Sequence, residues 1–280
     1  METAAAPPAD LAARVADLSW YHVLDLPGGI TTPGWFDLRP STTVVPLPAS
    51  LAGKRCLDVG TWDGFWAFEI ERRGAAEVVA IDIDDPQRWD WPPQSIVGGA
   101  AKDRLTFLEG FKSQAAGFRL AHEALGSKVE RRDLSVYDLT PQEVGTFDVV
   151  FLGSLLLHLR DPVRALGALR SVCSGQAVIA DMVDLIPSLL RPRTPSARLE
   201  GLDQSWWWLP NRAGLLRMVE SAGFQIDEAT SIYYVPTGPA HPPAPLRSIP
   251  KGLLTPKGRE QLIMHWRGLP HVAVRARPLG

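Results

Sequence analysis

Residues 55–64 read Arg-Cys-Leu-Asp-Val-Gly-Thr-Trp-Asp-Gly, and this stretch decides the fold. Its first five residues are a short apolar run that predicts a buried strand, and Gly60 and Gly64 then mark a tight turn. Residues 62–73 follow with helical spacing. A strand that enters a glycine-containing turn and then a helix is typical of proteins in which helices cover a parallel sheet.

The alternation of strand and helix continues along the chain. Further strands are predicted at Val78–Asp82, Val129–Arg132, Thr146–Leu152, Gln176–Met182, Gln225–Val235 and His271–Arg277. Helices are predicted at Phe118–Gly126, Asp161–Val172, Asn211–Ala222 and Gly258–Trp266. We therefore expect an α/β fold with a doubly wound, mostly parallel sheet of seven strands and an antiparallel edge formed by the last strands.

Segments that lack this alternation of strand and helix divide the chain. Residues 1–48 predict an N-terminal tail and a cap rich in Trp, Pro and Gly, and residues 49–280 predict the main α/β domain. Within that domain, insertions are expected at about residues 84–116, 183–210 and 236–267, where prolines break the pattern.

Composition narrows the function classes. Of the 280 residues, 45% are hydrophobic and 21% are charged, and the net charge is −2 with a pI of about 6.3, which does not suit a surface devoted to binding phosphates. Two cysteines are too few for a thiolate metal site, and the histidines do not occur at the spacing of metal ligands, so we expect no metal site. No stretch is long enough to span a membrane and the start lacks a signal peptide pattern, so a cytoplasmic location is expected. The oligomeric state stays open.

Carboxylates stand where the first strand turns into the first helix. Asp58 ends that strand and Asp63 lies inside the turn, where they would repel the pyrophosphate of a dinucleotide. The ammonium and sulfonium of S-adenosylmethionine would instead be attracted. Asp82 ends the next strand, the position from which a carboxylate accepts the ribose hydroxyls of an adenosine. These residues predict S-adenosylmethionine as the cofactor.

Three stretches carry a family resemblance. Leu57–Gly64, Ala80–Ile83 and Phe147–Phe151 resemble the class I methyltransferases, which have a Rossmann-like fold. The leader at residues 19–40, together with Trp208-Leu-Pro210, resembles bacterial methyltransferases grouped with the wobble-uridine tRNA-modifying family. The resemblance covers about residues 19–235.

The resemblance implies roles for residues of the cofactor site. Asp58, Gly60, Thr61 and Gly64 would hold the methionine end of the cofactor. Asp82 and Ile83 would hold the ribose and adenine, with Ser135 and Val136 at the adenine edge. Gly153 and Ser154, after the fourth strand, would pass under the sulfonium.

One departure from the family bears on the reaction. The tRNA enzymes that transfer a carboxymethyl group carry a tyrosine before the histidine of the fourth-strand motif, whereas this chain has Leu157 before His158. We therefore expect methyl transfer from ordinary S-adenosylmethionine to a small-molecule acceptor, with a hydroxyl oxygen as the acceptor atom. A tRNA methyltransferase acting on a wobble uridine stays open, since arginines gather at 191, 193 and 198. So does a non-catalytic cofactor-binding protein.

Two residues are candidates for catalysis. His158 follows the fourth strand, and histidine is the residue type suited to proton transfer near neutral pH, although a hydrogen bond that fixes the following turn would also explain it. Asp181 ends the fifth strand on the same side of the sheet, where a helix cap or a pairing with a nearby arginine is the alternative role.

A lid over the site is predicted from the aromatic segments. His22, Trp35 and Arg39 in the leader, and Trp206 and Trp207 before the last long helix, would exclude water and contact the acceptor. The alternative is that these bulky residues only cover the core.

Overall fold

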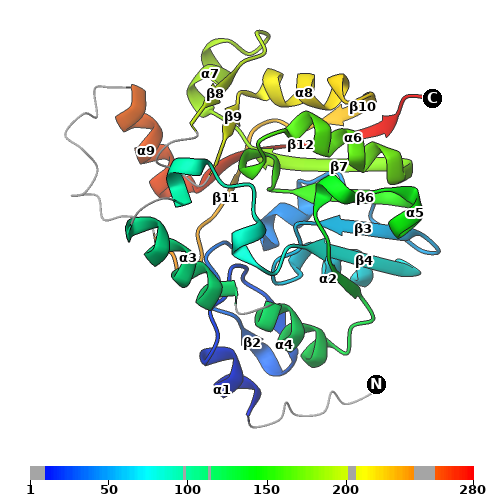
Figure 1. Ribbon diagram of the computed structural model, residues 1–280, viewed down its shortest axis with the longest axis vertical. Coiled ribbons are helices and arrows are strands. Elements are labelled where there is room, and N and C mark those ends of the chain that lie inside the picture. The colour runs from blue at the N-terminus through cyan, green and yellow to red at the C-terminus, as the bar shows by residue number, and fades with distance from the viewer. Residues whose placement is uncertain (1–9, 97–98, 113–114, 201–205, 243–255) are drawn as a thin grey trace.

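The computed structural model describes residues 10–96, 99–112, 115–200, 206–242 and 256–280. Its central sheet has eight strands, seven of them in the order β10-β12-β7-β6-β3-β4-β5, and β11 also pairs with β12 (Figure 1). The strands are β3 (Arg55–Val59), β4 (Glu77–Asp82), β5 (Glu130–Asp133), β6 (Phe147–Gly153), β7 (Cys173–Met182), β10 (Phe224–Ala229), β11 (Tyr233–Val235) and β12 (Leu269–Pro278). Neighbours from β5 to β7 are parallel, whereas β12 is antiparallel to its three partners.

This sheet confirms the predicted doubly wound fold, with one difference in strand number. The predicted strand Gln225–Val235 is divided into β10 and β11. Thr230, between them, donates its N–H to the Ala273 carbonyl and accepts the Ala273 N–H with its side-chain oxygen. Because a hydroxyl replaces a backbone carbonyl there, the ladder with β12 is interrupted, and the sheet has eight strands instead of seven.

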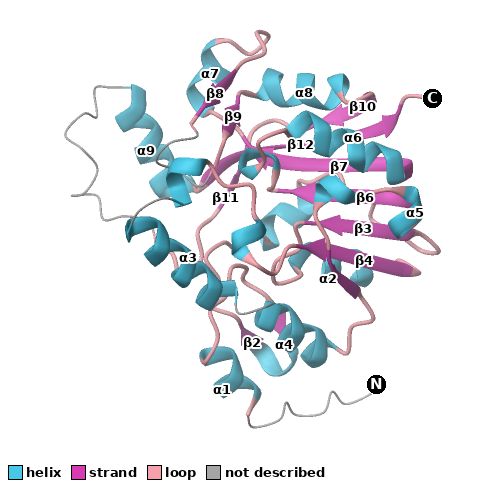
Figure 2. Ribbon diagram, viewed as in Figure 1, coloured by secondary structure: helices cyan, strands magenta, loops and turns pink. Residues whose placement is uncertain are grey.

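Helices cover both faces of the sheet (Figure 2). They are α1 (Leu11–Ala16), α2 (Phe65–Arg72), α3 (Gly99–Lys112), α4 (Ala116–Leu125), α5 (Pro141–Val144), α6 (Pro162–Val172), α7 (Leu185–Leu190), α8 (Arg212–Ser221) and α9 (Pro256–Arg267). Residues of α1, α2 and α4 pack on one face, and residues of α5, α6 and α8 pack on the other. No helix in the described part of the chain is both long and apolar enough to cross a membrane.

Local signals in the sequence explain where the helices begin and end. The Asp161 carboxylate accepts the Arg164 N–H at the start of α6, where Pro162 occupies the first turn. Asn211 caps α8 in the same way through the Gly214 N–H. The helix predicted from residue 62 begins only at Phe65, because residues 60–64 form a loop with several positive φ angles.

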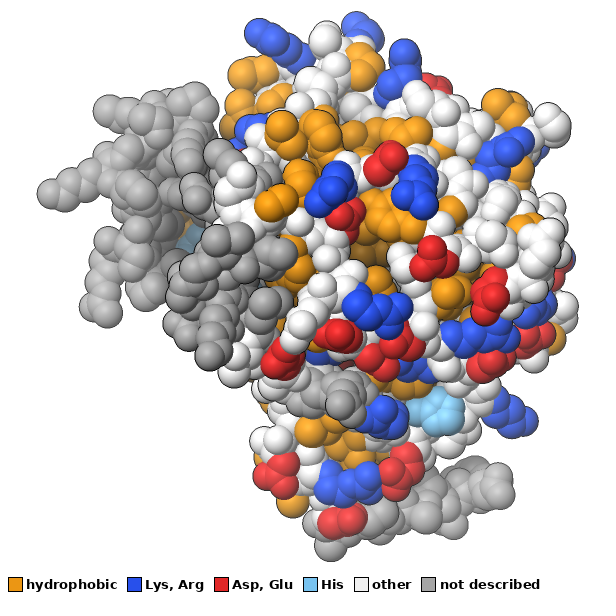
Figure 3. Space-filling model, viewed as in Figure 1, with side chains coloured by type: hydrophobic (Ala, Val, Ile, Leu, Met, Phe, Trp, Pro, Cys, Tyr) orange, Lys and Arg blue, Asp and Glu red, His pale blue; other side chains and the backbone are white. Residues whose placement is uncertain are grey.

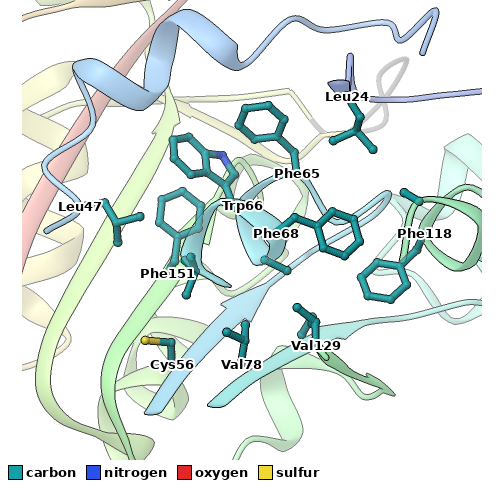
Figure 4. Close-up of a cluster of buried hydrophobic side chains, with 14 of the residues drawn as sticks. Leu24, Leu47, Cys56, Phe65, Trp66, Phe68, Val78, Phe118, Val129 and Phe151 are labelled. Carbon is teal, nitrogen blue, oxygen red and sulfur yellow. The ribbon is translucent and has the colours of Figure 1, made fainter. Parts of the chain in front are cut away.

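The leader contributes to the main core. Trp20 is 1% exposed and belongs to the same apolar cluster as Phe68, Phe118 and Phe151. Figure 4 shows side chains of α2 between the leader and the sheet, with Phe68 beside Phe118. A short pair of strands, β1 (Asp25–Leu26) and β2 (Ile30–Thr31), orders the leader. Residues 10–48 are therefore part of the packed structure in addition to covering it.

Two of the segments predicted as insertions follow the carboxyl ends of parallel strands, β4 and β7. The insertion at 84–116 contains α3, and the one at 183–210 contains α7 and the pair β8 (Ala197–Leu199) and β9 (Trp208–Pro210). The arrows of β3 and β4 point toward the side on which α3 lies (Figure 2). Open α/β sheets bind their ligands at this edge.

Candidate active site

The loop between β3 and α2 is tied to the end of β4. Gly60 has a φ of +79°, and its N–H and that of Thr61 both donate to the Ile81 carbonyl, at 2.9 and 3.2 Å. The Trp62 N–H donates to the Asp82 carboxylate at 2.7 Å. The two predicted parts of the cofactor site, the glycine loop and the acid at the end of the second strand, are thus joined by hydrogen bonds.

Incompletely satisfied buried polar atoms lie along this loop. Among the described residues, Trp62 Nε1 has no hydrogen-bond partner, and Asp58 Oδ2 and Thr61 Oγ1 form no hydrogen bond of good geometry, although the Thr61 side chain lies close enough to lower the pKa of Asp58. Asp58 is 1% exposed, and burial raises the pKa of its carboxyl to about 7. Buried polar atoms are normally paired, so the incompletely satisfied atoms between the end of β3 and Trp62 are consistent with a ligand that binds there.

Two loop residues have structural roles that the sequence did not show. The Asp63 carboxylate does not point at a ligand, because its Oδ2 accepts the backbone N–H groups of Tyr21 and His22, at 2.6 and 3.0 Å. It fastens the leader to the loop. A Cβ on Gly64 would lie 2.5 Å from the Phe68 ring, so the absence of a side chain at Gly64 serves packing under α2.

Asp82 is held by a buried ion pair that the sequence did not suggest. Lys112 Nζ, at the end of α3, lies 2.6 Å from Asp82 Oδ1, and the side chains are 2% and 12% exposed. The ammonium also lies 4.8 Å from the Trp62 ring and 5.0 Å from the Trp89 ring. Oδ1 accepts the Ile83 N–H as well. A ribose that binds Asp82 must therefore share the carboxylate with Lys112 or displace it.

Aromatic rings from the leader and from α3 cover the loop. The Tyr21 ring stacks on Trp62 with centroids 4.3 Å apart, and Trp35 lies 4.7 Å from Phe111. His22 lies below, and burial lowers the pKa of its imidazole to about 3, so the ring is neutral. The structure thus brings Trp35 and His22, both predicted for the lid, into contact with the Tyr21 ring.

Arg39 does not join that layer. Its guanidinium forms ion pairs with Asp25 and Asp37, at 2.8 and 2.7 Å, and the side chain is 42% exposed. Because both partners belong to the leader, Arg39 stabilises the leader at the surface and does not line the site.

Ser154, predicted at the sulfonium, and His158 and Asp181, predicted for catalysis, lie at the ends of β6 and β7 or directly after them. Ser154 is exposed directly after β6, and His158 ends the short helical turn Leu156–His158. Asp181, at the end of β7, is almost fully buried. Its carboxylate accepts the N–H groups of Leu155 and Leu156, at 3.0 and 2.7 Å, and of Met182 at 2.8 Å. Asp181 therefore fixes the turn after β6, and its oxygens are not directed at a substrate.

A histidine that the sequence analysis did not select completes this edge. His271 Nε2 lies 2.9 Å from Ser154 Oγ, and His271 Nδ1 lies 2.9 Å from the Leu269 carbonyl oxygen. The side chain is 5% exposed, and burial lowers its pKa to about 4. Because β12 runs antiparallel to β7, its first residues reach the edge at which the parallel strands end.

The comparisons with known proteins agree with this geometry. The profile of a family described as a methyltransferase domain matches residues 39–229. The chain belongs to this methyltransferase family.

Relatives of the methyltransferase differ in what their names say they act on. A tRNA U34 carboxymethyltransferase from Dichelobacter nodosus is 28% identical over 180 residues, 64% of this chain and 48% of that protein. A ubiquinone biosynthesis O-methyltransferase from Hahella chejuensis is 30% identical over 129 residues, 46% of this chain and 42% of that protein. The chain spans about half the length of the curated relatives it matches. Among solved structures, a 1,6-didemethyltoxoflavin-N1-methyltransferase from Burkholderia thailandensis aligns with a TM-score of 0.45 at 15% identity, over 82% of this chain and 72% of that one.

The cofactor of the methyltransferase domain is S-adenosylmethionine. The residues present fit this group: a buried carboxylate at Asp58 and a buried hydroxyl at Thr61, both incompletely satisfied, and an acid at Asp82. Within the described residues, no cluster of three or more His, Cys, Asp or Glu side chains could hold a metal ion.

The tryptophans before α8 connect the methyltransferase sheet to its insertions. Trp207 Nε1 donates to the Asp90 carbonyl, and the Arg160 guanidinium lies 4.9 Å from the Trp207 ring. Trp206 packs against a small apolar cluster beside the acceptor edge, formed by Leu157, Met182 and Leu209 with Met264 and Leu269. Of the two, Trp206 is the one placed with apolar residues at the end of β7.

Proposed function

We propose that this methyltransferase transfers the methyl group of S-adenosylmethionine to a hydroxyl oxygen of a small, largely apolar molecule. The apolar cluster around Trp206 at the acceptor edge carries the proposal. Its members come from the turn after β6, the end of β7, β9, α9 and the start of β12. Leu157, Met182 and Leu209 are buried, so a flat apolar acceptor would gain binding energy from the partly exposed members Trp206, Met264 and Leu269, whereas a phosphate backbone would not.

On this proposal, the cofactor is held by residues of the glycine loop and of the next two strand ends. Asp58 binds the ammonium, and Gly60 and Thr61 let the chain pass close to the methionine end. Asp82 accepts the ribose hydroxyls. Ile83, Ser135 and Val136 line the adenine, and Ser135 already orders its own loop by accepting the Tyr137 N–H. Bound S-adenosylmethionine would supply an electrophilic methyl group, and Gly153 and Ser154 would hold its sulfonium end.

The protein's own contribution to the reaction is to align the acceptor and exclude water. The aromatic layer of Tyr21, Trp35 and Trp62 shields the loop from solvent. Asp181 holds the turn after β6 through backbone hydrogen bonds, which fixes Ser154 and His158 relative to the sheet. We propose a positioning role for Asp181 in place of the catalytic role predicted from its location.

Charge at the surface argues against tRNA as the acceptor. On the face shown in Figure 3, basic and acidic side chains are interspersed and do not form one basic strip. Of the arginine group at 191–198, Arg198 forms ion pairs with Asp184 and Glu200. A protein that grips tRNA must present several unneutralised cations to phosphates.

Binding to tRNA tests the acceptor class. A gel-shift titration with total tRNA at two salt concentrations should show no saturable complex below about 10 μM at physiological salt. A matched variant with Arg191, Arg193 and Arg198 changed to Ala should behave like the wild type. Tight binding that weakens several-fold at the higher salt, and that this triple variant loses, would favour the tRNA enzyme.

A further inference from the structure

The hydrogen bonds of His271 fix which of its ring nitrogens carries a proton. Nδ1 lies 2.9 Å from the Leu269 carbonyl oxygen, which can only accept, so Nδ1 must donate. Burial lowers the pKa of His271 to about 4, so the ring is neutral at physiological pH and Nε2 has a lone pair and no proton. The Nε2 atom is therefore an acceptor.

This tautomer fixes the direction of the Ser154 hydroxyl. Ser154 Oγ lies 2.9 Å from His271 Nε2, and because Nε2 can only accept, Ser154 must donate its proton to it. A hydroxyl that has donated its only proton presents lone pairs on its remaining sides. Ser154 is exposed directly after β6, at the edge where open α/β sheets bind ligands, so the Oγ lone pairs are available to an acceptor that binds there.

We propose that Ser154 contacts the methyl acceptor through its oxygen and accepts a hydrogen bond from it, which selects acceptors that carry an O–H or N–H group. His271 is the positioning residue that holds Ser154 in this direction. The inference rests on the proposed function and deepens it, because it states what the acceptor must offer at the reacting atom. An ether, a thioether or a ring nitrogen without a proton is disfavoured at this position.

The tautomer is tested first, on the full-length protein with ¹⁵N-labelled histidine and bound S-adenosylhomocysteine. We expect one imidazole with its proton on Nδ1 that stays neutral down to about pH 5. Its Nε2 resonance should shift in Ser154→Ala. The Tyr233 ring on β11 packs against His271, with ring centroids 5.8 Å apart, and Asp181 lies on the neighbouring strand β7 opposite Val272, so spectra at pH 5.5 and pH 8 are compared. A proton on Nε2, or titration near pH 6.5, would overturn the inference.

The selection is tested with a matched pair of probes, phenol and anisole, which differ in a single hydrogen-bond donor. In the complex with S-adenosylhomocysteine, phenol should bind about tenfold more tightly than anisole. The preference should vanish in Ser154→Ala and His271→Ala and return in Ser154→Thr, which restores the hydroxyl. Ser171→Ala on α6 and His122→Ala on α4 serve as matched controls and should keep it.

The outcomes separate this inference from the proposed function. Failure of the wild type to bind S-adenosylhomocysteine in calorimetry would contradict the proposed function and the inference with it. Binding of S-adenosylhomocysteine together with equal affinity for phenol and anisole, or with no binding of either, would contradict the inference alone.

Discussion

Replacing Asp82 by Ala tests the cofactor site most severely, because this carboxylate pairs with Lys112 and is also proposed to bind the ribose. Its first expected effect is on binding. Removal of the charged acceptor of the ribose hydroxyls should weaken the binding free energy by about 1.5–3 kcal/mol, so the dissociation constant of S-adenosylhomocysteine should rise roughly 10- to 150-fold. Its second effect is on folding. Lys112 pairs with Asp82 at 2.6 Å and is 2% exposed, and leaving one member of a buried pair alone costs about 3–5 kcal/mol.

The two effects are separated with a double variant. Asp82→Ala/Lys112→Met removes both charges, so it should regain most of the lost stability in thermal unfolding while keeping the weak binding in calorimetry. Asp82→Ala that binds S-adenosylhomocysteine as tightly as the wild type would refute the assignment of Asp82 to the ribose. A double variant as unstable as the single one would refute the buried ion pair.

Three further predictions concern the same site. Burial raises the pKa of Asp58 to about 7, so protons should compete with the ammonium of S-adenosylhomocysteine for this carboxylate. The affinity of the protein for S-adenosylhomocysteine, measured by calorimetry, should therefore fall about tenfold from pH 8 to pH 6. In Asp58→Asn the affinity should not change over this pH range. Lys112→Met alone should bind S-adenosylhomocysteine a few-fold more tightly, since the ribose no longer shares Asp82, and weaker binding would mean that Lys112 helps to hold the cofactor. Asp63→Ala should lower the free energy of unfolding, measured by urea denaturation, by about 2–4 kcal/mol, because the Tyr21 and His22 N–H groups lose their acceptor. Asp63→Asn keeps an oxygen at this position, so its loss of unfolding free energy should be less than half as large.

The regular part of the fold was predictable because its signals are local. The apolar run around Val149 and Phe151 is buried on both faces as strand β6, and the caps at Asp161 and Asn211 start α6 and α8 where their residue types predict. The division of the strand at Thr230 was not predictable, since it depends on the register with β12.

The direction of a side chain was the main information that the sequence lacked. Asp58 at the end of β3 and Asp63 in the loop that follows are both buried carboxylates, yet Asp58 interacts with Thr61 whereas Asp63 binds the backbone of the leader. Lys112 lies in an insertion without a repeating pattern, so nothing in the sequence linked it to Asp82. His271 could have been found, because a last strand predicted to run antiparallel must begin at the edge where the parallel strands end.

Transfer of a trideuteromethyl group from labelled S-adenosylmethionine tests the central claim most directly. The full-length protein is incubated with the labelled cofactor and either a small-molecule extract or total tRNA, and both pools are examined by mass spectrometry. The account predicts a labelled methyl ether in the small-molecule pool, no label in tRNA nucleosides, and loss of the product in Asp82→Ala/Lys112→Met at cofactor concentrations that saturate the wild type. Label in a tRNA nucleoside, or no label in either pool, would contradict it.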